Sequence, residues 1–203
     1  MDLVVLVPDK NFEFGIRGLL SRPASLGIRQ VQYNIVVHPK RDPGCVKTPH
    51  ELLRLYCRDH QHAVLMFDKE GSGQENTPTQ QLVADLQGRL AANGWGARAE
   101  VIVLEPELEI WVFSPSIYVQ RCLGWKKAGR LRDWLESQGL WVPGHPKPAR
   151  PKEAVERVLL DLRRPRSSSL YECLGRSVST NDCQDAAFHR FLQTLADWFP
   201  PPP

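Results

Sequence analysis

Four short, largely apolar runs, each followed by a segment with helical periodicity, constrain the fold of this chain more than any other feature of its sequence. The runs occupy residues 3–7, 31–37, 63–67 and 100–104. Runs of this kind are typical of strands buried on both faces of a sheet. Helical segments follow at residues 12–20, from Thr48, at 77–93 and from Pro106. Because strands that alternate with helices form parallel sheets, this part of the chain predicts an α/β fold, with a mostly parallel sheet flanked by helices.

After Gly124 the pattern changes, and only helical periods remain. They cover residues 126–138, 151–164, 168–174 and 181–199, with a proline-rich linker at 141–151 between the first two. The sequence therefore predicts an α/β domain at residues 1–125 and a C-terminal helical extension at residues 126–203.

Composition and local sequence exclude several classes of protein. No apolar stretch approaches the roughly 18 residues of a membrane-spanning helix, and no secretory signal precedes the first predicted strand. Six Trp and seven Phe argue against a disordered chain. The short apolar stretches also predict that the protein has no membrane partner. The five cysteines are odd in number and contain no CxxC pair, which favours reduced thiols in a cytoplasmic protein. The chain also lacks a P-loop motif and a GxSxG motif.

Carboxylates follow three of the four predicted strands. In an open parallel sheet, ligands bind at the carboxyl ends of the strands, so these side chains are expected at one edge. Only His38 follows the second strand. The acids after the other three strands are Asp9, Glu13, Asp68, Glu70, Glu105, Glu107 and Glu109.

Clustered carboxylates raise one another's pKa unless a cation lies among them. Oxygen ligands without His or Cys suit Mg²⁺ or Mn²⁺, which serve phosphoryl chemistry. Each acid also has a purely structural interpretation. Asp9 could be a helix N-cap, Glu13 a solvated helix residue and Glu70 a loop residue, whereas Glu105, Glu107 and Glu109 could be first-turn acids favoured by the helix dipole.

Three segments resemble a known family. They are residues 4–13 (VVLVPDKNFE), 64–70 (VLMFDKE) and 104–111 (LEPELEIW). Together they resemble the Toprim domain of small defence-associated proteins, such as OLD-family nucleases and RloB-like proteins, and the end of the chain looks like proteins of the methylation-associated defence system. The resemblance covers roughly residues 1–125. It implies a Toprim-like fold and a Mg²⁺-dependent nuclease that acts in antiviral defence.

The resemblance also implies roles for four residues. Glu13 would act as general acid or base, Asp68 and Glu70 would hold Mg²⁺ or Mn²⁺, and Glu109 would complete the metal site with Glu13. Two positions depart from the family pattern: Pro8-Asp9 replaces its glutamate-glycine, and Glu70 replaces an aspartate. These departures keep open a second hypothesis, a non-catalytic Toprim-like adaptor subunit of a defence complex. A receiver-like module with Asp68 as phospho-acceptor is a third hypothesis.

Basic residues concentrate in the second part of the chain. Residues 1–120 contain 12 Lys/Arg and 14 Asp/Glu, whereas residues 121–203 contain 14 and 9. Arg163, Arg164 and Arg166 lie at the end of the predicted helix 151–164. There they either complement the helix dipole or bind the phosphates of a nucleic acid partner in a salt-dependent way.

Overall fold

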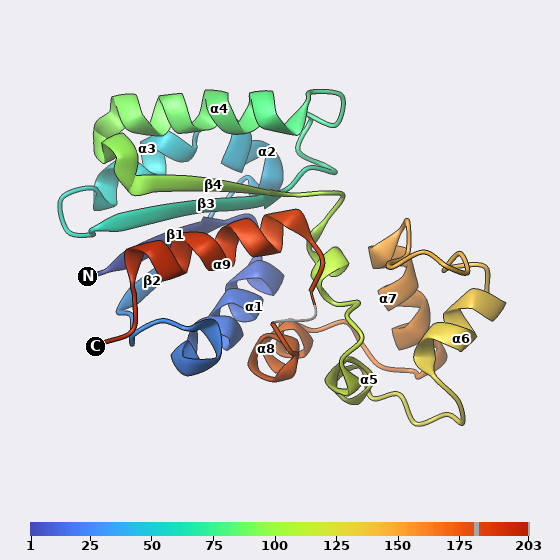
Figure 1. Cartoon of the computed structure of the whole chain (residues 1–203). Helices are drawn as coiled ribbons and strands as arrows, with labels where there is room; N and C mark the ends of the chain where they lie inside the picture. The colour runs from blue at the N-terminus through green and yellow to red at the C-terminus, as the bar shows by residue number, and fades with distance from the viewer. Residues whose placement is uncertain (181–182, 203) are drawn as a thin grey trace.

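The computed structural model describes residues 1–180 and 183–202 and confirms the α/β fold. Its four strands form an all-parallel sheet in the order β2-β1-β3-β4 (Figure 1). They are β1 (Leu3–Val7), β2 (Tyr33–Val37), β3 (His62–Asp68) and β4 (Ala99–Leu104). The centre of the sheet is fully buried because side chains alternate between two covered faces. The carboxyl ends of the strands therefore meet at one edge, as predicted.

Helices cover both faces of the sheet (Figure 1). Apolar side chains of α2 (Arg41–Lys47), α3 (Pro49–Leu53) and α4 (Thr79–Leu90) pack with Val4 and Leu6 of β1 on one face. On the other face, α1 (Lys10–Leu20), α8 (Ser168–Ser177) and α9 (Ala186–Trp198) pack with Leu3, Val5 and Val7. The sheet is thus the central layer of three.

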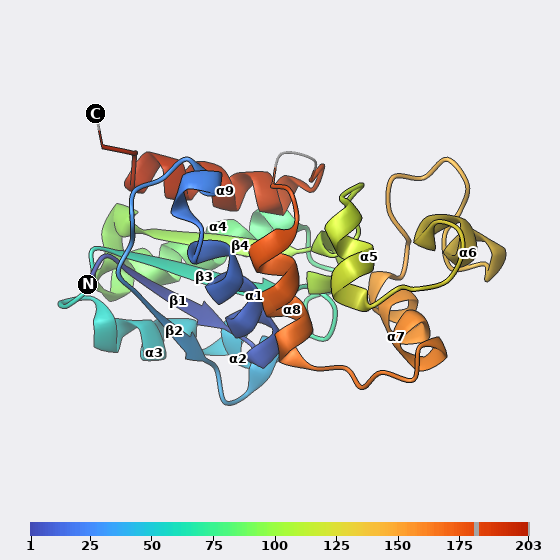
Figure 2. The same ribbon diagram turned by 90° about the horizontal axis from the view of Figure 1, so that it is seen from below.

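Helices α1 and α8 pack side by side with almost no space between their backbones (Figure 2). A Cβ atom on Gly175 of α8 would lie 2.4 Å from the carbonyl oxygen of Gly15, and one on Gly18 of α1 would lie 2.5 Å from that of Glu172. Only glycine permits this approach at Gly18 and Gly175, so these two residues help to fix where α8 begins relative to the sheet edge.

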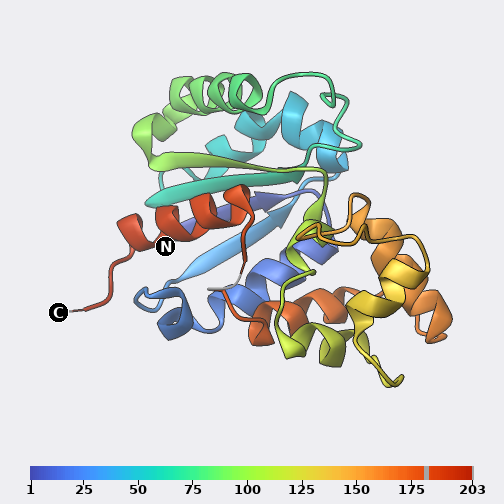
Figure 3. The same ribbon diagram turned by 45° about the vertical axis from the view of Figure 1, so that its right-hand side comes forward.

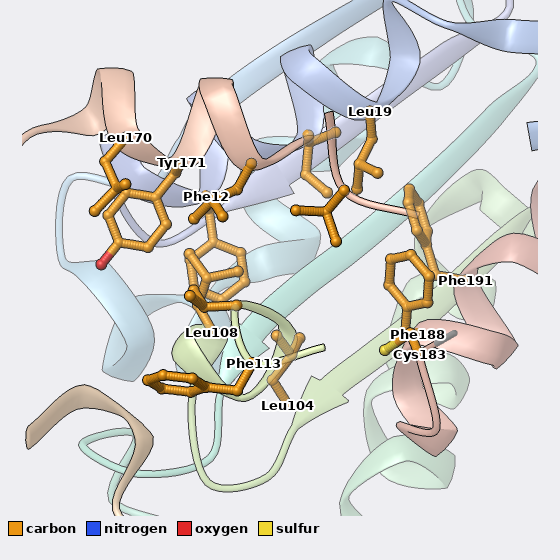
Figure 4. Close-up of a cluster of buried hydrophobic side chains, with 14 of the residues drawn as sticks. Phe12, Leu19, Leu104, Leu108, Phe113, Leu170, Tyr171, Cys183, Phe188 and Phe191 are labelled. Atoms are coloured by element: carbon orange, nitrogen blue, oxygen red, sulfur yellow. The ribbon is translucent and has the colours of Figure 1, made fainter. Parts of the chain in front are cut away.

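The helical extension shares the hydrophobic core of the sheet. A single cluster of buried side chains runs from Leu3 to Phe199 and contains residues of α1, α5 (Ile117–Leu123), α8 and α9. Figure 4 shows Phe12 of α1 beside Tyr171 of α8 within this cluster. At the predicted boundary near residue 125, alternating strands and helices give way to helices alone. The hydrophobic core continues across this boundary. Helices α6 (Leu131–Ser137) and α7 (Pro151–Asp161) lie beyond the carboxyl ends of the strands (Figure 3).

Several element boundaries differ from those predicted. Pro106 does not begin an α-helix: the Glu105–Pro106 peptide is cis, and a 3₁₀ turn, η5 (Leu108–Trp111), follows. Thr48 precedes α3, but its side chain contacts the His38 ring and makes no capping bond. The short helix α2 was not predicted at all. The predicted start of the last helix at Asn181 lies outside the described residues.

The prediction of five reduced thiols is wrong. Cys122 of α5 and Cys173 of α8 form a disulfide, whereas Cys45, Cys57 and Cys183 are free. The two half-cystines are 51 residues apart in the chain, and only the packing of α5 against α8 brings them together. Cysteine count and spacing could not reveal this pair.

In the described part of the chain, none of the helices has both the length and the apolar character needed to cross a membrane.

Candidate functional site

A large cleft opens at the carboxyl edge of the sheet. Its volume is about 1390 Å³, which exceeds the roughly 300–1,000 Å³ of a small-molecule pocket. The ends of β1, β2 and β3 form its floor, and the first residues of α7 and α8 form the opposite wall. The open sheet edge and the helical extension thus enclose one site.

Asp68, the last residue of β3, lies half-buried on the floor of this cleft. Its Oδ1 accepts a hydrogen bond of 2.6 Å from the backbone N–H of Leu108. Burial raises the pKa of Asp68 well above its usual value, and the negative charges of Asp42 and Glu109 raise it further. The structure places this predicted site residue where the sequence expects it.

Asp42 is the neighbour of Asp68 that sequence analysis missed. It lies in the first turn of α2, and its Oδ1 accepts a 2.9 Å hydrogen bond from the backbone N–H of Asp68. Burial raises the pKa of Asp42, and this hydrogen bond only partly opposes the effect. Asp42 lies four residues after His38, in the first turn of the helix that follows the second strand, and this position is the signal for it in the sequence.

Four more carboxylates line the cleft, and one of them, Glu153, pairs with Arg150. Glu70 is exposed there, and its carboxylate has no hydrogen-bond partner among the described residues. Asp9 accepts bonds from the backbone N–H groups of Asn11 and Phe12, so it is the N-cap of α1. Glu107 is buried and accepts from the backbone N–H of Lys152; burial raises the pKa of Glu107.

The structure does not bring Glu13 to these acids. Its carboxylate pairs with Arg17 one turn along α1, at 2.8 Å, and is not part of the cleft lining. Glu105 likewise points elsewhere and pairs with Lys69, which lowers the pKa of Glu105.

Glu109 lies behind the cleft wall and holds a basic residue in place. Its carboxylate is buried and accepts hydrogen bonds from the Arg166 guanidinium and the Tyr171 hydroxyl. In Figure 4 the Tyr171 ring belongs to the apolar cluster while its hydroxyl points away. Burial and the charge of Glu109 raise the pKa of Tyr171, so the hydroxyl stays protonated and donates.

Of the three predicted phosphate-binding arginines, only Arg166 lines the cleft. Arg164 donates to the carbonyl of Cys122 and lies against Gly124, and Arg163 is exposed just after α7. The remaining basic side chains of the cleft are Lys10, Arg41, Arg150 and Lys152.

The site therefore combines an acidic floor with a basic rim. Neither Asp42 nor Asp68 has an ion-pair partner among the described residues, and burial together with neighbouring carboxylates raises the pKa of each. A cation between them would offset the repulsion among these carboxylates. The available donors are all oxygens, which suits Mg²⁺. Across residues 1–180 and 183–202, no group of three or more His, Cys, Asp or Glu is arranged to hold a metal. One or two carboxylates nevertheless suffice for Mg²⁺ when substrate phosphates supply further ligands.

No protein-family model, curated protein or solved structure matches this chain.

Proposed function

We propose that the cleft is the active site of a divalent-cation-dependent nuclease. The observation that carries this proposal is the Asp42–Asp68 pair, which has no ion-pair partner among the described residues and lies in a cleft rimmed by basic side chains. Two adjoining carboxylates attract a cation, and a basic rim attracts a polyanion. The Toprim resemblance extends the proposal to a role in antiviral defence.

The residues have distinct roles in this proposal. Asp42 and Asp68 would hold Mg²⁺, which when bound polarises a phosphate and acidifies water. Lys152 and Arg166 would neutralise the charge of the phosphodiester; the hydrogen bonds that the Arg166 guanidinium donates to Glu109 and Tyr171 fix its position. Glu70, the exposed carboxylate without a partner in the described chain, would accept the proton of the attacking water.

A second candidate function is a non-catalytic subunit of a defence complex. It is favoured by one observation: Glu13, the expected general acid or base, is bound to Arg17 outside the cleft.

Cleavage of labelled DNA and RNA with Mg²⁺, and with EDTA as control, distinguishes the two functions. Asp68→Asn preserves the size of the side chain but removes a cation-binding charge, so we expect activity to fall at least about a hundredfold. Asp133→Asn on α6 is the matched control, because Asp133 is exposed and pairs only with Arg130. Activity that is absent from the wild type, or unchanged in Asp68→Asn, would contradict the nuclease proposal.

A further inference from the structure

Arg41 has a backbone conformation that arginine rarely adopts. Its φ is +50°, in the left-handed region that favours glycine. The structure describes one other such non-glycine residue, Arg163, with φ of +51°. Arg163 follows α7, where the N–H of Arg163 bonds to Leu160 and that of Arg164 to Leu159, the usual left-handed end of a helix. Arg41 instead begins a helix, so helix termination does not explain its conformation.

The buried His38 ring builds the turn that holds Arg41. The carbonyl of His38 accepts from the N–H of Arg41, and its Nδ1 accepts from the N–H of Lys40. Its Nε2 is bonded to Thr48. A Cβ on Gly44 would lie 2.1 Å from the ring, so only glycine lets α2 pack against it. The conformation of Arg41 is thus fixed by several contacts at once.

This turn directs two consecutive residues to different parts of the cleft. Asp42 bonds to the backbone of Asp68 on the floor, whereas the Arg41 side chain lines the cleft and is exposed. Arg150, Lys152 and Arg166 of the rim each pair with a glutamate. The Arg41 guanidinium has neither an ion pair nor a hydrogen bond to the described residues, so all of its donors remain available to a ligand.

We infer that Arg41 binds a backbone phosphate of the substrate in the cleft that contains the Asp42–Asp68 pair. This inference rests on the proposed nuclease function and names a substrate-binding residue for it. A planar guanidinium can donate two parallel hydrogen bonds to one phosphate. It would also offset the repulsion between that phosphate and the acidic floor. Glycine would meet the backbone requirement with less strain, so the side chain itself accounts for an arginine in this turn.

The test compares Arg41→Gly with Arg163→Gly, because both substitutions relieve a left-handed residue and remove one positive charge. The probe is a short fluorescein-labelled oligothymidylate, followed by anisotropy in EDTA over a range of salt concentrations. We expect Arg41→Gly to weaken binding about tenfold and to lower the slope of log K against log salt by about 0.7. Arg163→Gly should bind like the wild type. The thermal midpoints of both variants should equal or exceed that of the wild type.

Unchanged binding by Arg41→Gly, equal losses in both variants, or no binding by the wild type at low salt would overturn the assignment. Cleavage of the same oligomer with Mg²⁺ is measured separately. Binding that depends on Arg41 in a protein that does not cleave keeps the assignment and removes the nuclease proposal.

Discussion

At the scale of single residues, the Asp42–Asp68 pair links stability to pH. Burial and the neighbouring negative charges make the folded protein hold the Asp68 proton to a higher pH than the unfolded chain does. As pH rises above the unfolded pKa of about 3.9, the folded state therefore binds more protons than the unfolded state. This group's contribution to stability is present at low pH and is lost as pH rises through the folded pKa.

Asp68→Asn should remove that loss, because an amide cannot ionise while its oxygen can still accept from Leu108. Near pH 3 we expect the variant and the wild type to have the same free energy of unfolding. Toward neutral pH the free energy of unfolding of the variant should exceed that of the wild type, by an amount that grows by at most about 1.4 kcal/mol per pH unit. Urea unfolding across this pH range without divalent cations measures it. Glu13→Gln is the control, because its exposed ion pair contributes little. A gain that does not change with pH would show that the pKa of Asp68 is not raised.

At the scale of elements, the contact between α1 and α8 positions one wall of the cleft. Ser167 and Ser168, at the start of α8, line the cleft, and Ser168 donates a hydrogen bond to Asn11 of α1. The approach of the two helices depends on Gly18 and Gly175, where a Cβ would meet backbone atoms of the other helix. The packing of two helices thus decides how the helical extension meets the sheet edge.

Gly175→Ala should destabilise the protein although alanine is the better helix former. Its Cβ would meet backbone atoms that cannot move independently, so we expect a loss of about 1–3 kcal/mol. Gly88→Ala on α4 is the matched control, because a Cβ there meets nothing within 4 Å. The control should gain roughly 0.5–1 kcal/mol. Equal effects in urea unfolding would contradict the close packing of α1 and α8.

At the scale of the whole molecule, one core and one disulfide join the sheet to the helical extension. The core runs from β1 to the end of α9, and the disulfide connects α5 to α8 across 51 residues. The disulfide lowers the conformational entropy of the unfolded chain, and this loss of entropy grows with the logarithm of the separation. The extension and the sheet are therefore expected to unfold together.

Replacement of both Cys122 and Cys173 by serine should lower the free energy of unfolding by about 2–4 kcal/mol under oxidising conditions. The difference should disappear when both proteins contain a reducing agent. Urea unfolding with and without reductant measures the effect. Alkylation of all five cysteines in the unfolded, non-reduced wild type would show that the disulfide is absent.

The sequence by itself determined the parallel sheet and the location of its functional edge. Apolar runs and helical periods depend on short stretches of chain, and strands joined by helices must run parallel. Asp68 and Glu70 directly follow a predicted strand, so their position at the carboxyl edge followed from the sequence alone. The N-cap role of Asp9, one of its two predicted interpretations, is also local.

Only the tertiary structure decided which side chains contact one another in and around the cleft. Asp42 reaches Asp68 across 26 residues, Glu109 reaches Arg166 across 57, and Cys122 reaches Cys173 across 51. Glu13 was expected from a resemblance to complete the site, yet a partner one helical turn away binds its carboxylate. The physical reason is range: secondary structure follows from neighbours along the chain, whereas the partner, burial and pKa of a side chain follow from segments that meet only when the helices pack.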